Sequence, residues 1–199
     1  MWTLHRIRHI ALSLWQRRHF HSYGKGLSFS PENSTFRYQA ITLGNHVFIG
    51  KEAIFSCEAE IGNYCIFGPR VYITSGRHEF TIVGKRIRYQ GESEVRKVVI
   101  EDDCWIGEGS LILRGIRIGE GTVVGGMSVV SKSLPPYVVC VGSPCRPIKL
   151  RYSDSELEQH LRILNGPNYN PHEMIERRHR EIESGGFSIH PDGSIHKIG

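Results

Sequence analysis

The sequence predicts an all-β protein built on a parallel β-helix, because large apolar residues recur at every sixth position in two series. The two series are Leu43, Ile49, Phe55, Ile61, Phe67 and Ile73, then Ile100, Ile106, Ile112, Ile118, Val124 and Val130. A second, mostly small set lies two residues before these positions: Val47, Ala53, Ala59, Cys65 and Val71, then Val98, Cys104, Ser110, Ile116, Thr122 and Ser128. A period of six fits neither an α-helix, with about 3.6 residues per turn, nor a long alternating strand. It is typical of a β-helix in which three hexads, about 18 residues, form one coil.

Glycine often follows the large residue directly, which predicts a sharp corner after each short strand. These glycines are Gly44, Gly50, Gly62, Gly68, Gly107, Gly119 and Gly125. We expect the large residue to point inward and the small residue to lie near a corner. We expect the glycine to supply the positive φ that a corner often requires. Each series then provides two coils, with partial coils at either end, around one continuous aliphatic column.

The register breaks between Ile73 and Ile100, which are 27 positions apart, because 27 is not a multiple of six. We therefore expect the chain to leave the β-helix as a loop of roughly 20 residues at about positions 77–97. A loop of this length inside a compact domain is usually functional or disordered. This one is rich in cations and holds a histidine: Arg77, His78, Lys85, Arg86, Arg88, Arg96 and Lys97.

The two ends of the chain differ from the repeats. Apolar residues at helical spacing predict an amphipathic helix over residues 2–20: Leu4, Ile7, Ala11, Leu14 and Trp15. Near the other end, Ser153 or Asp154 can cap a helix that runs to about Leu164, and Ser153 and Glu156 have capping-box spacing. A second helix is expected over 171–183 and a hairpin over 187–198. We therefore divide the chain into a basic arm (1–26), a β-helix domain (27–150) and a helical extension with a tail (151–199).

The net charge of +5 comes entirely from the arm, since residues 1–31 hold five of the 25 basic residues and no acid, while the other 20 basic residues balance 20 acids. This distribution argues against a uniformly basic nucleic-acid binder. The five cysteines show no CxxC spacing, and no secretion signal or stretch of about 20 apolar residues is found. We expect a cytoplasmic protein with reduced, mostly buried thiols. Two interpretations of residues 1–21 stay open: a helix packed on the β-helix or a neighbouring subunit, and an interfacial helix on anionic lipid at the inner membrane face.

Several motifs occur together in the second half of the β-helix domain. They are Cys104-Trp105-Ile106-Gly107, Gly115-Ile116-Arg117-Ile118-Gly119, Ser128-Val129-Val130-Ser131-Lys132, Pro135-Pro136-Tyr137 and Gly142-Ser143-Pro144-Cys145-Arg146. Over about residues 41–150 the chain resembles the hexapeptide-repeat acyltransferase superfamily, and most closely its galactoside, maltose, nodulation and polysaccharide O-acetyltransferases. The resemblance implies a left-handed coil, against the usual right-handed crossover. It also implies a homotrimer with active sites between subunits, acetyl-CoA as co-substrate and a saccharide or nucleotide-sugar acceptor.

The same resemblance implies that His78 is the general base, in the context Ser75-Gly76-Arg77-His78. Moving an acetyl group from a thioester to a hydroxyl requires a base for the hydroxyl proton and donors for the developing oxyanion. Histidine is suited to act as the base because its ordinary pKa, about 6.5, is close to neutral pH. A thioester is already activated, so we expect neither a metal nor a covalent intermediate. The group that orients the His78 ring is not identified, because adjacency in sequence does not place Glu79 against it.

The resemblance also implies contacts with acetyl-CoA and the acceptor. Backbone groups near Trp105, Glu108 and Gly126 match family positions that contact the oxyanion and the pantetheine of CoA. Ser131 and Lys132 match positions that contact the pantetheine and the nucleotide. The cations of Lys132, Arg146 and Lys149 are suited to the CoA phosphates. Candidate acceptor contacts are Ser56 and Arg77. Family members often carry Asn near the position of Ser56, which puts the acceptor set in doubt.

Three alternatives remain open on the sequence alone. One is N-acetylation of an amino sugar on a nucleotide carrier. Another is a structural β-helix without catalysis. A metal-dependent carbonic anhydrase of β-helix type would need three convergent histidines, and the coils supply little besides His46.

Overall fold

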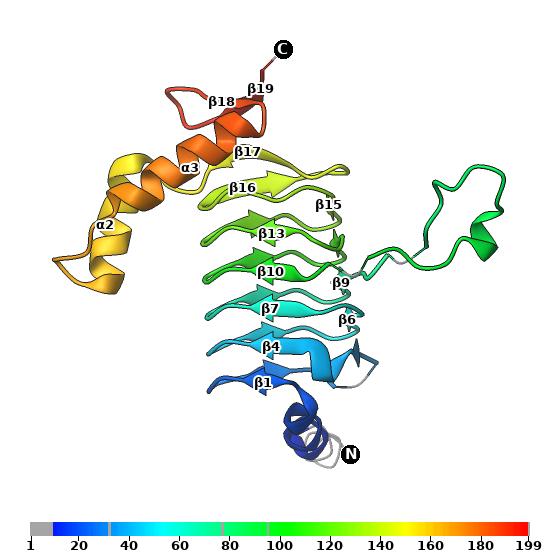
Figure 1. Ribbon diagram of the computed structural model, residues 1–199. Coiled ribbons are helices and arrows are strands. Elements are labelled where there is room, and N and C mark those ends of the chain that lie inside the picture. Colours follow the sequence, from blue (N-terminus) through cyan, green and yellow to red (C-terminus); the bar gives the residue numbers. More distant parts are fainter. Residues whose placement is uncertain (1–9, 32, 77, 95, 199) are drawn as a thin grey trace.

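The computed structural model describes residues 10–31, 33–76, 78–94 and 96–198. Its strands stack into a solenoid with three parallel sheets, which we call faces A, B and C (Figure 1). Face A holds β1 (Ser22–Tyr23), β4 (Ile41–Leu43), β7 (Ala59–Ile61), β10 (Val98–Ile100) and β13 (Arg117–Ile118). Face B holds β2 (Ser28–Phe29), β5 (Phe48–Ile49), β8 (Ile66–Phe67), β11 (Trp105–Ile106), β14 (Val123–Val124), β16 (Val138–Val141) and β17 (Arg146–Leu150). Face C holds β3 (Thr35–Phe36), β6 (Ile54–Phe55), β9 (Tyr72–Ile73), β12 (Leu111–Ile112) and β15 (Val129–Val130). The predicted all-β solenoid is confirmed.

The core of the solenoid consists of the two predicted columns. All twelve large residues of the hexad series are at most 3% exposed, and the smaller set two positions earlier is at most 7% exposed. Three members of the smaller set are polar, and each has a hydrogen-bond acceptor in a neighbouring coil or corner. The Ser110 and Ser128 hydroxyls donate to the Gly125 carbonyl at 3.1 and 2.7 Å, and the Thr122 hydroxyl donates to the Pro135 carbonyl at 2.6 Å. These bonds offset the cost of burying hydroxyls in an otherwise apolar column.

The expectation that the corner glycines supply a positive φ is wrong, although glycine is needed at these positions for another reason. Positive φ values occur three residues after the inward side chain, at His46, Glu52, Tyr64, Arg70, Asp103, Gly109, Gly115, Gly121 and Met127, and not at the glycines that follow it directly. Those glycines are needed because the coils approach too closely for a side chain. A Cβ atom on Gly107 would lie 2.4 Å from the Gly126 amide nitrogen. Glycine at this position therefore permits backbone-to-backbone stacking.

The coils between paired strands are close to 18 residues long, from 16 between β14 and β16 to 20 between β1 and β4, except for one long insertion. Ile41 of β4 pairs with Ala59 of β7, 18 positions on, whereas Ala59 pairs with Val98 of β10, 39 positions on. The coil between β7 and β10 therefore holds 21 extra residues. They leave after β9, include a short 3-10 helix (η3, Ile87–Tyr89), and project sideways from the solenoid (Figure 1).

The N-terminal end of the solenoid is covered by a helical segment, residues 10–16 followed by a 3-10 turn (η1, Arg17–His19). The Tyr38 hydroxyl, in η2 (Tyr38–Ala40), donates to the Gln16 side chain at 2.8 Å. Phe20 is buried against Phe29 and Phe36, with ring centroids 5.6 and 5.4 Å apart. These contacts attach the helix to the first coil.

The C-terminal extension consists of α2 (Asp154–Asn165), α3 (His172–Ser184) and a hairpin of β18 (Phe187–Ile189) and β19 (Ile195–Lys197). The predicted capping box is confirmed, because Ser153 and Glu156 exchange side chain-to-backbone hydrogen bonds. Helix α3 binds the outer side of face A through ion pairs, in which Arg117 contacts Glu181 at 2.6 Å and Arg177 contacts Glu101 at 2.7 Å. This part of face A is therefore occupied within the protomer.

We expect Ile112→Asp to unfold the protein, because a carboxylate at a fully buried position of the aliphatic column has no partner and is costly to desolvate. Thr35→Asp is the matched control, since Thr35 is an exposed residue on the same face C. Circular dichroism melting of both variants checks the register. Equal melting temperatures for Ile112→Asp and the unsubstituted protein would contradict it.

Candidate functional site

His78 lies at the base of the inserted loop, where the two legs of the loop pair. It forms an antiparallel bridge with Glu92, and the Glu79 amide donates to the Gly91 carbonyl at 3.0 Å. The chain enters this pairing directly from the end of β9 at the corner between faces C and A. His78 is exposed. Its side chain is therefore accessible to a substrate.

Ser56 lies at the same corner, one coil below the loop. Its hydroxyl donates to the Ile73 carbonyl at 3.1 Å and accepts a hydrogen bond from the Ser75 amide at 3.3 Å. Ser56 thus supports the first residues of the loop and is a near neighbour of the segment that leads to His78. Arg77, the other predicted acceptor contact, lies outside the described residues.

Glu79 shapes the loop and is committed to neighbours other than the His78 ring. Its Oε1 atom accepts hydrogen bonds from the Phe80 amide at 2.8 Å, the Thr81 amide at 3.0 Å and the Thr81 hydroxyl at 2.7 Å. Hydrogen bonds from Thr81 and Phe80 lower the pKa of this carboxyl group. The carboxylate therefore closes a local turn at the start of the loop.

Arg114 was not among the predicted site residues, yet it holds the base of the His78 loop. Its guanidinium donates to the Ser93 hydroxyl and to the Glu94 carbonyl, the latter at 2.9 Å. A Cβ atom placed on Gly76 would lie 3.9 Å from the Arg114 side chain. Arg114 therefore lies beside Gly76, where the chain enters the loop, as well as beside Ser93 and Glu94, where it returns. The signal in the sequence was positional, because Arg114 follows the inward Ile112 by two residues, as Ser75 follows Ile73 one coil below.

A second group of predicted residues lies around face B and the corner between faces B and C. Trp105 points outward from β11 and is 53% exposed. Glu108 and Gly126 occupy successive coils of the corner, where the Met127 amide donates to the Glu108 carbonyl at 2.8 Å. The Glu108 carboxylate forms an ion pair with Arg70. Within the described part of the chain, the Glu108 and Gly126 amides have no acceptor, so both remain available as donors.

The predicted cations lie near the C-terminal end of the solenoid. Lys149 pairs with Val139, which continues the outward column of Trp105 and Val123 on face B. Arg146 begins β17, and Lys132 is exposed with Ser131 at the C/A corner after β15. Among the residues that the structure describes, the three cations form no ion pair, so all are free for an external anion.

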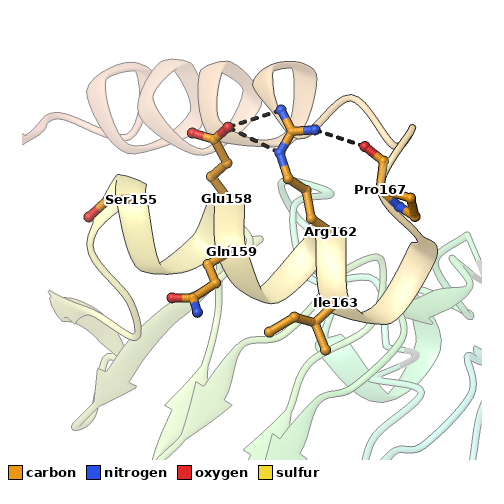
Figure 2. Close-up of a pocket in the computed structure, with 6 residues that line it drawn as sticks. All are labelled: Ser155, Glu158, Gln159, Arg162, Ile163 and Pro167. Carbon is orange, nitrogen blue, oxygen red and sulfur yellow. Dashed lines mark hydrogen bonds and ion pairs between the residues drawn. The ribbon is translucent and has the colours of Figure 1, made fainter.

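The predicted residues thus fall into two groups that one protomer does not unite. His78, Ser56, Ser131 and Lys132 belong to the C/A corner, whereas Glu108 and Gly126 belong to the B/C corner and Trp105 to face B. The width of face C separates the two corners. A hollow along α2 is remote from both, and Figure 2 shows it lined by residues that include the Glu158–Arg162 ion pair at 3.0 Å. None of its lining residues was predicted to act in a site.

Comparison with known proteins identifies the family to which this solenoid belongs. The profile of the bacterial transferase hexapeptide family (six repeats) matches residues 97–132. A crystal structure of a maltose O-acetyltransferase from Clostridium difficile 630 is 36% identical, with a TM-score of 0.63 over 69% of this chain and 73% of that one. The chain belongs to the hexapeptide-repeat acetyltransferase family.

Two further members of the hexapeptide-repeat family are informative. The galactoside O-acetyltransferase of Lactococcus lactis is 38% identical over 98 residues, which are 49% of this chain and 45% of that protein, so this chain matches about half of that relative. The acetyltransferase VCA0836 of Vibrio cholerae, in a structure complexed with acetyl coenzyme A, is 28% identical with a TM-score of 0.63 over 70% of this chain and 76% of that one.

Two features are absent from the described residues of this family member, a metal-binding cluster and a membrane-spanning helix. No group of three histidine, cysteine or acidic side chains is arranged to hold a metal ion there. No described helix is both long enough and apolar enough to cross a membrane.

All five cysteines are buried and unpaired, and burial raises the pKa of Cys57, the neighbour of Ser56, to about 11. That thiol stays protonated at neutral pH and is a poor nucleophile.

We expect Arg114→Ala to loosen the His78 loop, because Arg114 donates two hydrogen bonds to the returning leg and a hydrogen bond typically contributes about 0.5–1.5 kcal/mol. Amide hydrogen exchange across residues 78–94 should rise roughly tenfold, the equivalent of about 1.4 kcal/mol. Arg88→Ala, which removes an exposed arginine of the loop itself, should leave exchange unchanged. Equal exchange in the two variants would show that Arg114 does not anchor the loop.

Proposed function

We propose that this protein transfers an acetyl group from acetyl-CoA to a hydroxyl group of a saccharide or glycoconjugate precursor. The observation that carries the proposal is the accessible His78 at the base of an anchored loop, in a chain whose relatives are named as sugar O-acetyltransferases. A relative complexed with acetyl coenzyme A supports the choice of donor. The free, buried cysteines fit a cytoplasmic location, where thiols stay reduced.

In this proposal His78 acts as the general base. The imidazole takes the proton of the acceptor hydroxyl while the hydroxyl oxygen forms a bond to the thioester carbonyl carbon. The resulting oxyanion accepts hydrogen bonds from backbone amides, for which the unpaired Glu108 and Gly126 donors are suited. When the tetrahedral intermediate collapses, the carbon–sulfur bond breaks, and the proton on His78 passes to the departing CoA sulfur. The products are an acetyl ester and free CoA.

The CoA moiety is expected to lie along the outer surface toward the C-terminal end. Trp105 and the B/C corner receive the acyl and pantetheine end, because exposed ring surface and free amides occur together there. Lys132, Arg146 and Lys149 are the candidates for the phosphates, since charge-assisted hydrogen bonds to phosphate are strong. Ser56 and Arg77 are the candidates for the acceptor.

The separation of the two groups supports a homotrimer in which neighbouring copies share each site. Apolar side chains stand outward on faces B and C, including Phe48 (46% exposed), Ile66 (48%), Ile54 (37%) and Tyr72 (38%), whereas α3 occupies part of face A. Packing face B of one copy against the C/A edge of the next brings Trp105 of one copy toward His78 of the other. Such a head-to-tail contact forms a closed ring when the rotation between neighbouring subunits divides a full turn. A ring of three copies would use both apolar faces of each solenoid.

We expect His78→Ala to lower turnover by roughly 10²–10⁴-fold, the usual contribution of a positioned base, while acetyl-CoA binding is retained. Release of free thiol from acetyl-CoA with a panel of sugars measures turnover, and calorimetry measures binding. His190→Ala, in the exposed hairpin of the tail, is the control and should keep full activity. Unchanged turnover in His78→Ala removes His78 from the reaction, and no thiol release with any acceptor favours a structural role.

The same panel separates O- from N-acetylation. Matched hydroxy- and amino-sugars compete for one site, and we expect the hydroxy-sugar to be acetylated, with amino-sugars on a nucleotide carrier tested alongside. Preferential acetylation of the amine would establish the alternative reaction.

Subunit mixing tests whether the site is shared. We expect His78→Ala and Trp105→Ala each to be inactive alone, and to regain part of the activity when co-refolded, because a mixed trimer contains an interface with both native residues. Light scattering should give three times the monomer mass of 22.6 kDa. Failure of the mixture to recover activity, or a stable active monomer, would place the whole site within one chain.

A further inference from the structure

The helix at the N-terminal end of the solenoid presents its apolar side away from the protein. Ala11, Leu14, Trp15 and Arg18 are all exposed, and their i, i+3, i+4, i+7 spacing places them on one side of the helix. Leu14 is 47% and Trp15 is 53% exposed, and Ile10 beside them is 51% exposed. A helix that packs on a core normally does the opposite.

The contacts with the first coil come from another side of the same segment. Gln16 accepts the hydrogen bond from the Tyr38 hydroxyl, and Phe20 is buried in the aromatic cluster just after the turn. The Trp15 ring lies edge-on to the His19 ring, with centroids 4.7 Å apart, beside a hollow that Arg37 and Tyr38 also line, yet it is still 53% exposed. The helix is therefore held in place while Leu14 and much of Trp15 stay open to solvent. Because the segment is attached through Gln16 and Phe20, its apolar side chains Ile10, Ala11 and Leu14 face away from the first coil.

Charge around the helix has one sign. Residues 1–31 contain no acid, and Arg17, Arg18 and Lys25 lie in the described part of this segment. Arg18 and Lys25 are exposed, and the Arg17 guanidinium lies over the Tyr23 ring at 5.8 Å from its centroid. Apolar side chains flanked by cations are the composition of a helix that lies at the headgroup level of a bilayer.

The position of the helix also suits a flat surface. It lies beyond β1 at one end of the solenoid, while α2 and α3 are attached near the other end (Figure 1). In the proposed trimer, whose solenoid axes run side by side, three such helices would face the same way. Three weak contacts on one surface bind much more tightly than one, because the second and third are intramolecular.

We propose that this N-terminal surface, made of Ile10, Ala11, Leu14, Trp15, Arg17 and Arg18, docks on a bilayer that contains anionic lipid. A nucleic acid would use the cations but leave the apolar side chains without a partner. A membrane uses both kinds of group, and its negative surface attracts each basic residue. An acetyltransferase held in this way would meet acceptors that are themselves attached to the membrane, with the His78 loop projecting sideways from the solenoid.

The test is co-sedimentation of the full chain with two kinds of vesicle, at low and at high salt. One kind contains phosphatidylglycerol and phosphatidylcholine at about 30:70, and the other contains phosphatidylcholine alone. We expect binding to the anionic vesicles to exceed binding to the neutral ones by roughly tenfold or more and to weaken with salt. Arg17→Gln with Arg18→Gln should lower the affinity about 25-fold, or about fivefold for each charge. Leu14→Gln with Trp15→Gln should lower it by roughly tenfold or more. The matched control is Ile163→Gln with Leu164→Gln, which changes two exposed apolar residues on α2 and should bind as the unsubstituted chain does.

Several results would overturn the proposal. Equal binding to both kinds of vesicle, or none to either, excludes anionic lipid as the partner. Unchanged binding by the Leu14/Trp15 variant excludes the helix as the docking element. A fall in oligomer mass for that variant, measured by light scattering without vesicles, would show that a second copy of the chain covers this side. Acetyl transfer to a soluble sugar, measured in parallel, should be the same in all these variants, so loss of docking and loss of the proposed reaction are separate outcomes.

Discussion

Hydrogen bonding between successive coils is the constraint on which the rest of this structure depends. The amide of Ile54 donates to the Val71 carbonyl at 3.0 Å, and the amide of Phe48 donates to the Cys65 carbonyl at 2.9 Å, in each case one coil further along. Parallel strands lie about 4.8 Å apart, so successive coils keep nearly the same length and repeat the same corners. This spacing explains the six-residue period and the absence of a side chain at Gly107, where the next coil passes at backbone contact distance.

Because strands cannot absorb extra residues, an insertion can only leave at a corner and return to it. The 21 extra residues that leave after β9 do this, and the coils above and below resume their pairing as if the loop were absent. Two residues of the solenoid wall hold the base of the loop, Arg114 above and Ser56 below. A rigid wall with one anchored projection gives His78 a defined place on an otherwise regular surface.

The sequence predicts the regular parts well because their signal is repeated. Every residue of the hexad columns is buried as expected, and the Ser153–Glu156 cap appears where its spacing predicted it. The irregular parts depend on single contacts between distant positions, for which one sequence carries little signal. Arg114 contacts residues 20 and 21 positions away, and Glu79 turns toward Thr81 and away from its neighbour His78. The division of the candidate site between two corners could not be predicted either, because it depends on which of three faces each motif occupies.

The end of the solenoid near the C-terminus has a consequence for how the protein behaves at high concentration. A stack of parallel strands ends in a row of unpaired backbone groups, which is a template for the first coil of another molecule and so for an open-ended filament. Here β17 turns back antiparallel to β16, with Pro147 opposite Cys140 and a register shift between Val139 and Cys140. A proline removes an amide donor, and a reversed, bulged strand does not match an incoming parallel coil. The last strand therefore makes the C-terminal edge of face B a poor template for the coil of another molecule.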